Sequence, residues 1–287
     1  MRRLNSVISG HENKNKPETR FISVLSGKGG VGKSLLAFNL AERLAASGYR
    51  VLVVDTDYSG GNIHILANIN CDFGLGQYAA EILSLPEAVT PLSPNLDILP
   101  APDGIGVRLL QSIAELARWI KKLRADSVTY DFVIIDHPSG ISDRITLVAH
   151  ACDLNLLVMI PELTSLADGY GLYKYLLQAH DNVACQLLLN RVVNEDEVNY
   201  IQNKFYALTE RFLDKVPGYL GCLPESDVFR QAVARQCPVA RVEPDSNALQ
   251  ALNRLSQTLA GYFDAAPINI TTTSIATINK SLVTADI

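Results

Sequence analysis

The chain has 287 residues, of which 48% are hydrophobic and 19% are charged, and its formal net charge is −5. This length and apolar content suit one α/β domain with a well-buried sheet and exclude an intrinsically disordered chain. The acidic balance argues against a diffuse basic surface for tight DNA binding, and no apolar run is long enough to predict a membrane span.

The five cysteines are odd in number and form no CxxC pair. They favour buried thiols in a reducing compartment over a disulfide framework, a structural zinc site or clustered iron–sulfur ligands. Residues 1–19 are predicted to be a polar leader, since they lack the apolar core of a secretory signal. Residues 20–263 carry the folded domain, and residues 264–287 are a Ser/Thr-rich tail. We therefore expect a cytoplasmic protein.

From residue 20 onward, short apolar runs alternate with longer segments of helical periodicity. The predicted strands are Phe21–Leu25, Val51–Asp55, Leu96–Pro100, Phe132–Asp136, Leu154–Ile160, Cys185–Asn190 and Tyr219–Cys222. The predicted helices are Ser34–Ser47, Val107–Ala125, Asp143–Ala151, Leu166–Ala179, Glu195–Leu213, Asp227–Gln236 and Ala248–Phe263. Several strands are apolar on both faces, as parallel strands covered by helices are. The pattern predicts an α/β fold with a doubly wound, mostly parallel sheet and helices on both faces.

A glycine-rich loop follows the first predicted strand and precedes the first helix. It matches the P-loop pattern G-x-x-x-x-G-K-[ST] and is made of Gly27, Lys28, Gly29, Gly30, Val31, Gly32, Lys33 and Ser34. Glycines let backbone N–H groups turn inward towards phosphate oxygens. Lys33 is expected to reach the β- and γ-phosphates, and the Ser34 hydroxyl is expected to bind Mg²⁺. The loop predicts a nucleoside triphosphate site with Mg²⁺.

Two more predicted strands end in acidic residues. Asp55 and Asp57 follow one strand, and carboxylates at this edge of an open sheet can hold the water shell of Mg²⁺ or orient an attacking water. Ordinary strand-end acids remain the alternative for that pair. Asp136 ends an apolar strand that reads as Walker B, near Mg²⁺. Gly140 has no side chain to block an approach of its N–H to the γ-phosphate.

Lys28 is a second lysine that the basic loop pattern does not require, and a solvated loop lysine is one interpretation. Together with the rest of the loop as far as Ser34, it resembles the deviant Walker motif of the MinD/ParA ATPases. The resemblance covers roughly residues 20–263. It implies that the cofactors are ATP and Mg²⁺, that Lys28 crosses to the nucleotide of a partner subunit, and that ATP joins two protomers in a homodimer.

The same resemblance assigns roles to individual residues. Lys28, Lys33 and Asp57 would act in hydrolysis, Asp57 by orienting or activating the attacking water. The metal would lie near Ser34, Asp55 and Asp136. The base would be held by Asn190, whose amide can both donate and accept, and by the segment around Pro224. We assign no catalytic role to His137 and expect a polar residue at a helix start.

Within this family, residues 136–143, 162–170 and 210–239 are most similar to flagellar-number regulators of the FlhG/FleN type. The similarity implies an ATP-dependent switch that regulates the placement or number of a cellular structure, flagella first of all. A flagellar GTPase or a transcriptional regulator would be its protein partner. The chain departs from the branch at His64, at His137-Pro138-Ser139, and in lacking an N-terminal Asp-Gln motif.

Other functions on related P-loop folds are alternatives: a partitioning ATPase, an iron–sulfur carrier or reductase component, and a tyrosine kinase. A ParA-type partitioning ATPase that binds nonspecific DNA is the main one, although the acidic balance makes nucleic acid an unlikely partner. An iron–sulfur carrier needs clustered cysteines, and a tyrosine kinase usually has a C-terminal tyrosine cluster; the chain has neither.

Two apolar stripes bear on peripheral contact with the inner face of the membrane. One is formed by Leu249, Leu252, Leu255, Leu259 and Phe263. Because its polar face carries few cations, packing against the sheet is the favoured interpretation. A second stripe, with Ile275, Ile278 and Leu282, lies in the tail, for which disorder and a weak anchor both stay open.

Overall fold

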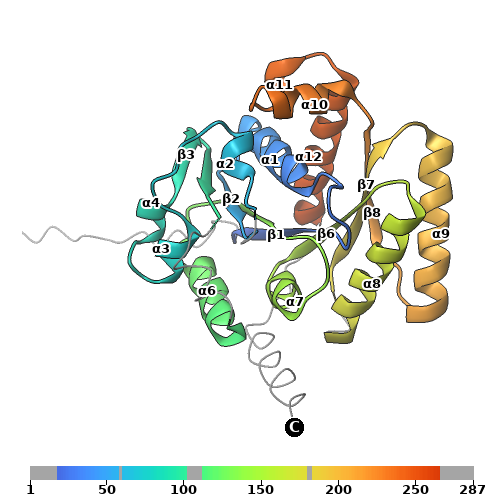
Figure 1. Cartoon of the computed structure of the whole chain (residues 1–287), viewed down its shortest axis with the longest axis horizontal. Coiled ribbons are helices and arrows are strands. Elements are labelled where there is room, and N and C mark those ends of the chain that lie inside the picture. Colours follow the sequence, from blue (N-terminus) through green and yellow to red (C-terminus); the bar gives the residue numbers. More distant parts are fainter. Residues whose placement is uncertain (1–17, 58–59, 102–111, 180–182, 266–287) are drawn as a thin grey trace, which may run out of the picture.

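An eight-stranded sheet forms the centre of the computed structural model, which describes residues 18–57, 60–101, 112–179 and 183–265. The strand order is β3-β4-β2-β5-β1-β6-β7-β8 (Figure 1). The strands are β1 (Arg20–Leu25), β2 (Val51–Asp55), β3 (Thr90–Ser93), β4 (Leu96–Leu99), β5 (Phe132–Asp136), β6 (Leu154–Met159), β7 (Cys185–Val192) and β8 (Gly218–Pro224). Neighbouring strands are parallel except for β3 and β4, which are antiparallel. The predicted α/β fold is confirmed.

Helices cover both faces of this sheet (Figure 1). They are α1 (Lys33–Ala46), α2 (Ile63–Leu66), α3 (Leu75–Ala79), α4 (Leu85–Ala88), α6 (Ile113–Asp126), α7 (Asp143–His150), α8 (Leu163–Ala179), α9 (Glu195–Leu213), α10 (Asp227–Ala234), α11 (Val239–Val242) and α12 (Asn247–Ala265). Strand β2 shows why both faces are needed, because alternate side chains point to opposite sides. Val51 and Val53 join the core with α1 and α12, whereas Leu52 and Val54 join the core with α6 and α7.

The first C-terminal stripe packs inside the protein. Leu252 and Leu259 of α12 are fully buried, and Leu249, Leu255 and Phe263 are nearly so. All five belong to the core shared with α1. Packing on the sheet, the favoured interpretation of this stripe, is therefore confirmed. Among the described helices we find no candidate for a membrane-crossing segment. The second stripe lies outside the described residues.

Some short elements were missed by the sequence analysis. The edge strand β3 and the helices α2, α3, α4 and α11 have only four or five residues each. Elements of this length contain too few residues for the helical or alternating pattern of apolar side chains to be recognised. Helix α8 begins at Leu163 rather than Leu166. Helix α6 begins at Ile113, and residues 107–111 of the predicted helix lie outside the described part of the chain.

The carboxyl ends of the central strands meet at one edge of the sheet. Asp55 at the end of β2 pairs directly with Asp136 at the end of β5. Leu25 at the end of β1 pairs with Leu157 of β6, and Met159 of β6 pairs with Leu189 of β7. The loops that follow these strands therefore lie together, where open α/β sheets bind their ligands.

Candidate functional site

The phosphate loop, residues 26–34, runs from the end of β1 into the first turn of α1, and its glycines have no room for side chains at two positions. A Cβ atom on Gly27 would lie 2.2 Å from the carbonyl oxygen of Asp168 in α8. A Cβ atom on Gly32 would lie 2.6 Å from Nδ2 of Asn190, and Gly32 has a φ of 94°. Gly32 also precedes α1 without a side-chain cap, so the helix start offers N–H donors to an anion. The shape of the loop fits a phosphate group.

Lys33, the first residue of α1, lies inside this loop with 7% of its surface exposed. Burial lowers the pKa of its ammonium group, against the opposing effect of Asp136 and Asp57. Its Nζ donates to Oγ of Ser139 at 2.6 Å. A desolvated ammonium group with a neutral hydroxyl as acceptor gains from a negatively charged oxygen, so Lys33 is well placed for phosphate.

Asp136 at the end of β5 is almost fully buried. Burial, and then the neighbouring Asp55, raise the pKa of its carboxyl group to about 8, while the Ser34 hydroxyl and Lys33 act in the opposite direction. In the described part of the chain, neither oxygen has a hydrogen-bond donor of good geometry. Two enclosed carboxylate oxygens without donors suit a hard cation such as Mg²⁺, which prefers oxygen ligands.

Asp55 is also fully buried, but both of its oxygens are hydrogen-bonded. Oδ1 accepts from the backbone N–H of Asp57 at 3.0 Å, and Oδ2 accepts from the N–H of Ile63 at 3.2 Å. The carboxylate thus holds the loop that carries Asp57 and satisfies the start of α2. In this structure Asp55 positions Asp57, and its predicted place in the metal shell stays a prediction.

Residues 137–142 connect β5 to α7 and lie against the phosphate loop. The N–H of Gly140, whose φ is 106°, donates to the carbonyl oxygen of Ser26 at 3.0 Å. The predicted contact of this N–H with the γ-phosphate stays a prediction and requires that bond to break. His137 is buried, and burial, followed by the nearby Lys33, lowers its pKa to about 3. The expectation of a helix start for His137 is wrong, because Ser142 caps α7.

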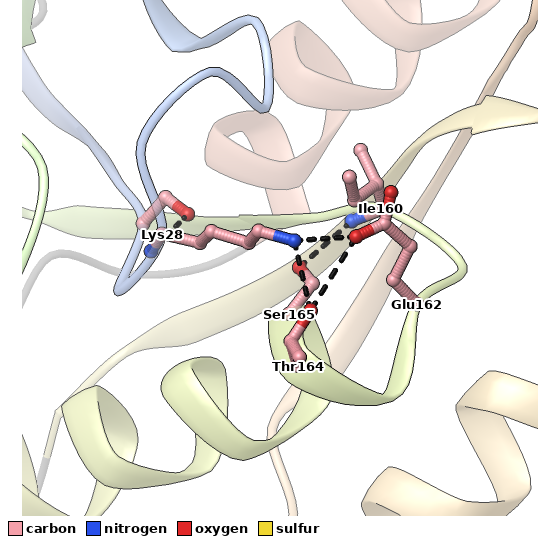
Figure 2. Close-up of polar contacts among 6 residues, drawn as sticks. Lys28, Ile160, Glu162, Thr164 and Ser165 are labelled. Carbon is pink, nitrogen blue, oxygen red and sulfur yellow. Dashed lines mark hydrogen bonds and ion pairs between the residues drawn. The ribbon is translucent and has the colours of Figure 1, made fainter.

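Lys28 points out of the phosphate loop towards the start of α8 (Figure 2). Its Nζ forms an ion pair with Glu162 and donates to Oγ1 of Thr164 at 2.8 Å. The Ser165 hydroxyl accepts from the N–H of Ile160 at 3.1 Å and so fixes the turn before the helix. The lysine side chain is 29% exposed and that of Glu162 is 53% exposed. Lys28 is therefore held at the rim, outside its own phosphate loop.

A cavity of about 210 Å³ opens beside the phosphate loop at Gly32 and Asn190. Its other walls come from Leu35, Leu36, Arg191, Leu223, Glu225, Ser226, Phe229, Arg230 and Val233. Such an apolar cavity with a few polar groups suits a flat base. Asn190 is engaged locally, since its Nδ2 donates to Val31 O at 2.7 Å and its Oδ1 accepts from Arg191 N at 2.9 Å. Nδ2 of Asn190 can donate one further hydrogen bond to a base, and Oδ1 can accept one further hydrogen bond from it.

Pro224 ends β8 next to this cavity, but the wall is formed by its neighbours Leu223 and Glu225. The direct contact of Pro224 with a base stays a prediction. The predicted residues thus lie along the carboxyl edge of the sheet. They extend from the cavity at Gly32 and Asn190, here called the base cavity, through the phosphate loop to Asp136.

Glu162, Thr164 and Ser139 were not assigned to the site from the sequence. One signal could have found Glu162: it follows β6 at the carboxyl edge of the sheet, as Asp57 follows β2. From the sequence, Ser139 is only one of the residues that depart from the flagellar-regulator branch. Its contact with Lys33 spans 106 residues of chain and could not be read from spacing.

Comparisons with known proteins agree with this geometry. The ParA family model, described as NUBPL iron-transfer P-loop NTPase, matches residues 18–184, more than half of the chain. The antiactivator FleN of Pseudomonas aeruginosa is 30% identical over 236 residues, which span 82% of this chain and 84% of that protein. The flagellum site-determining protein YlxH of Helicobacter pylori is 23% identical, over 93% of this chain and 91% of that protein.

A solved structure supports the same assignment. The septum site-determining protein MinD of Pyrococcus horikoshii, in complex with Mg-ADP, superposes with a TM-score of 0.70 and 26% identity. The match covers 87% of this chain and all of that one. The family model covers the β1–loop–α1 unit, Asp57 and Asp136, on which the predicted resemblance rested. The chain belongs to the ParA/MinD family of P-loop ATPases.

Proposed function

We propose that this protein is a switch that binds ATP with Mg²⁺, dimerises around it, and regulates the placement or number of a cellular structure, flagella first of all. The observation that carries the proposal is the opposite placement of two lysines in one loop. Lys33 points into the phosphate loop, where it contacts Ser139. Lys28 points out of it, to Glu162 in the turn before α8 and to Thr164 in the first turn of α8.

The end of the loop that carries Lys33, here called the inner end, is the ATP and Mg²⁺ site in this proposal. Lys33 and the N–H donors at the start of α1 hold the phosphates. Asp136 and Ser34 hold the cation, which neutralises phosphate charge when bound. Asp57 orients the attacking water, and Asp55 keeps Asp57 in place through the hydrogen bond to its backbone. Asn190 and the adjoining cavity hold the base.

The end of the loop that carries Lys28, here called the outer end, is the dimer contact. Because Lys28 is held at the rim by an exposed ion pair, it is released at low free-energy cost. Within a dimer it places an extra cation on the phosphates of the neighbouring nucleotide, a role like that of an arginine finger. ATP thereby links the two protomers, and hydrolysis separates them.

The relatives support the proposed cellular role and partners. FleN is named as an antiactivator, YlxH as a flagellum site-determining protein and MinD as a septum site-determining protein. By this likeness, the ATP-bound dimer binds a transcriptional regulator or a flagellar GTPase, in the cytoplasm or at the inner face of the membrane. The partitioning alternative predicts an ATP-dependent, salt-sensitive gel shift on nonspecific DNA.

Light scattering during size-exclusion chromatography, with ATP or ADP and Mg²⁺, tests the proposal together with hydrolysis rates. We expect the wild type to be dimeric with ATP and monomeric with ADP. Lys28→Ala is expected to stay monomeric and to hydrolyse ATP at least about 100-fold more slowly, since it lacks the charge on the partner's phosphates.

Asp57→Ala is the matched control, because it should still dimerise with ATP while hydrolysing it roughly 100-fold more slowly. A wild type that remains monomeric in every nucleotide state contradicts the dimer. Wild-type hydrolysis by Asp57→Ala contradicts the role of Asp57.

A further inference from the structure

The hydroxyl of Ser139 lies against the phosphate loop at Lys33 and Gly29, although the P-loop pattern does not require a hydroxyl there. Its Oγ accepts from Nζ of Lys33 at 2.6 Å. A Cβ atom placed on Gly29 would lie 3.8 Å from the same Oγ, so the hydroxyl stands over the loop. The adjoining bond from Gly140 N–H to Ser26 O keeps this segment against the loop.

Gly29 and Gly32 of the loop have different neighbours. The base cavity opens at Gly32 and Asn190, whereas Ser139 lies beside Gly29. A nucleotide with its base in that cavity would extend its phosphates into the loop and away from the cavity. Its last phosphate then lies near Ser139 and the end of the Lys33 side chain, which in P-loops reaches the β- and γ-phosphates.

A serine hydroxyl can serve two partners at once. Its oxygen accepts one hydrogen bond, here from Lys33, and its proton is a separate donor. That donor suits an oxygen of a terminal phosphate bound to the same lysine. A hydrogen bond to a charged oxygen is stronger than one between neutral groups.

We infer that Ser139 is a specificity-determining residue that distinguishes ATP from ADP, because its hydroxyl donates to the γ-phosphate while accepting from Lys33. The inference rests on the proposed ATP site. It adds a side-chain contact to the backbone contact predicted for Gly140. ADP has no γ-phosphate and leaves the proton of Ser139 without this partner, so loss of the hydroxyl affects ATP selectively.

The test measures the dissociation constants of the full chain for ADP and for a non-hydrolysable ATP analogue, each with Mg²⁺. Wild type, Ser139→Ala and Ser139→Thr are compared. They are compared again in a Lys28→Ala background, where dimerisation does not add to the affinity for ATP. Ser139 is exposed at the surface, so its truncation to alanine leaves the core intact.

Ser139→Ala is expected to lower the preference for the ATP analogue over ADP by about ten- to 100-fold, the contribution of one hydrogen bond to a charged group. Ser139→Thr, which keeps the hydroxyl, should retain most of the preference. If the wild type binds both nucleotides and Ser139→Ala leaves their ratio unchanged, the inference is wrong while the proposed function stands. If the wild type binds neither nucleotide, the proposed function fails as well.

Discussion

The two ends of the phosphate loop place the same side chain in opposite environments. Lys33 at the inner end is 7% exposed, and its acceptor is a neutral hydroxyl. The Lys28 side chain at the outer end is 29% exposed, and its partner is the carboxylate of Glu162, whose side chain is 53% exposed. Among the described residues, the hydrogen-bond acceptor of the first ammonium group is neutral, whereas that of the second is charged.

This difference explains how one loop can carry two functions. A buried ammonium group has lost water and gains strongly from a phosphate, so Lys33 is suited to a permanent binding site. An exposed ion pair stabilises little, so Lys28 can exchange Glu162 for another anion. The inner end therefore favours affinity, and the outer end favours reversible association.

Removal of the inner charge should have the largest effect. Lys33→Ala is expected to weaken ATP and ADP binding by about 10²- to 10³-fold, since it removes charge-assisted hydrogen bonds of about 1.5–3 kcal/mol each. Isothermal titration calorimetry at a low protein concentration measures both affinities. Lys28→Ala is the matched control and should bind ADP within about threefold of the wild type. Equal losses in the two variants contradict the division between the two ends.

The second prediction concerns Asp136, the buried carboxylate that faces the inner lysine. Its pKa in the folded chain is about 8, whereas the ordinary value is 3.8. The folded protein without nucleotide therefore loses stability as the pH rises from about 4 to about 8, because the buried group must ionise. Asp136→Asn lacks this loss and should be about 1–3 kcal/mol more stable than the wild type at pH 8.

Thermal unfolding with a chelator at pH 5 and pH 8 checks this prediction, and roughly 2–4 °C is expected for each kcal/mol. Mg²⁺ with nucleotide should stabilise the wild type more than Asp136→Asn, because the neutral amide holds the cation more weakly than a carboxylate. Identical pH dependence in the two proteins contradicts the raised pKa of Asp136.

The smallest effect is expected at the outer end. Glu162→Gln weakens the contact that holds Lys28 on α8 and should allow dimerisation at an ATP concentration no more than about fivefold lower, as exposed ion pairs contribute little. Analytical ultracentrifugation over a series of ATP concentrations measures the shift. Glu115→Gln removes the similarly exposed pair with Arg118 on α6 and is the matched control. A shift to higher ATP concentration in Glu162→Gln would show that Glu162 supports the dimer instead.

The amino-acid sequence by itself determined the alternation of strands and helices, the phosphate loop and the acids at the strand ends. These are local patterns, because a buried strand, an amphipathic helix and a turn that needs glycine each have a characteristic residue pattern within about fifteen residues. Short elements such as β3 and α2 leave too few repeats to be recognised.

The tertiary structure alone decided which partners the polar side chains have. Lys28 meets Glu162 across 134 residues, Lys33 meets Ser139 across 106, and Asn190 meets Val31 across 159. These contacts depend on the order of β1, β5, β6 and β7 in the sheet, and sequence spacing does not encode that order. The phosphate loop could thus be predicted from the sequence, whereas the position of Lys28 outside it depends on β6, which leads into α8, lying next to β1 in the sheet.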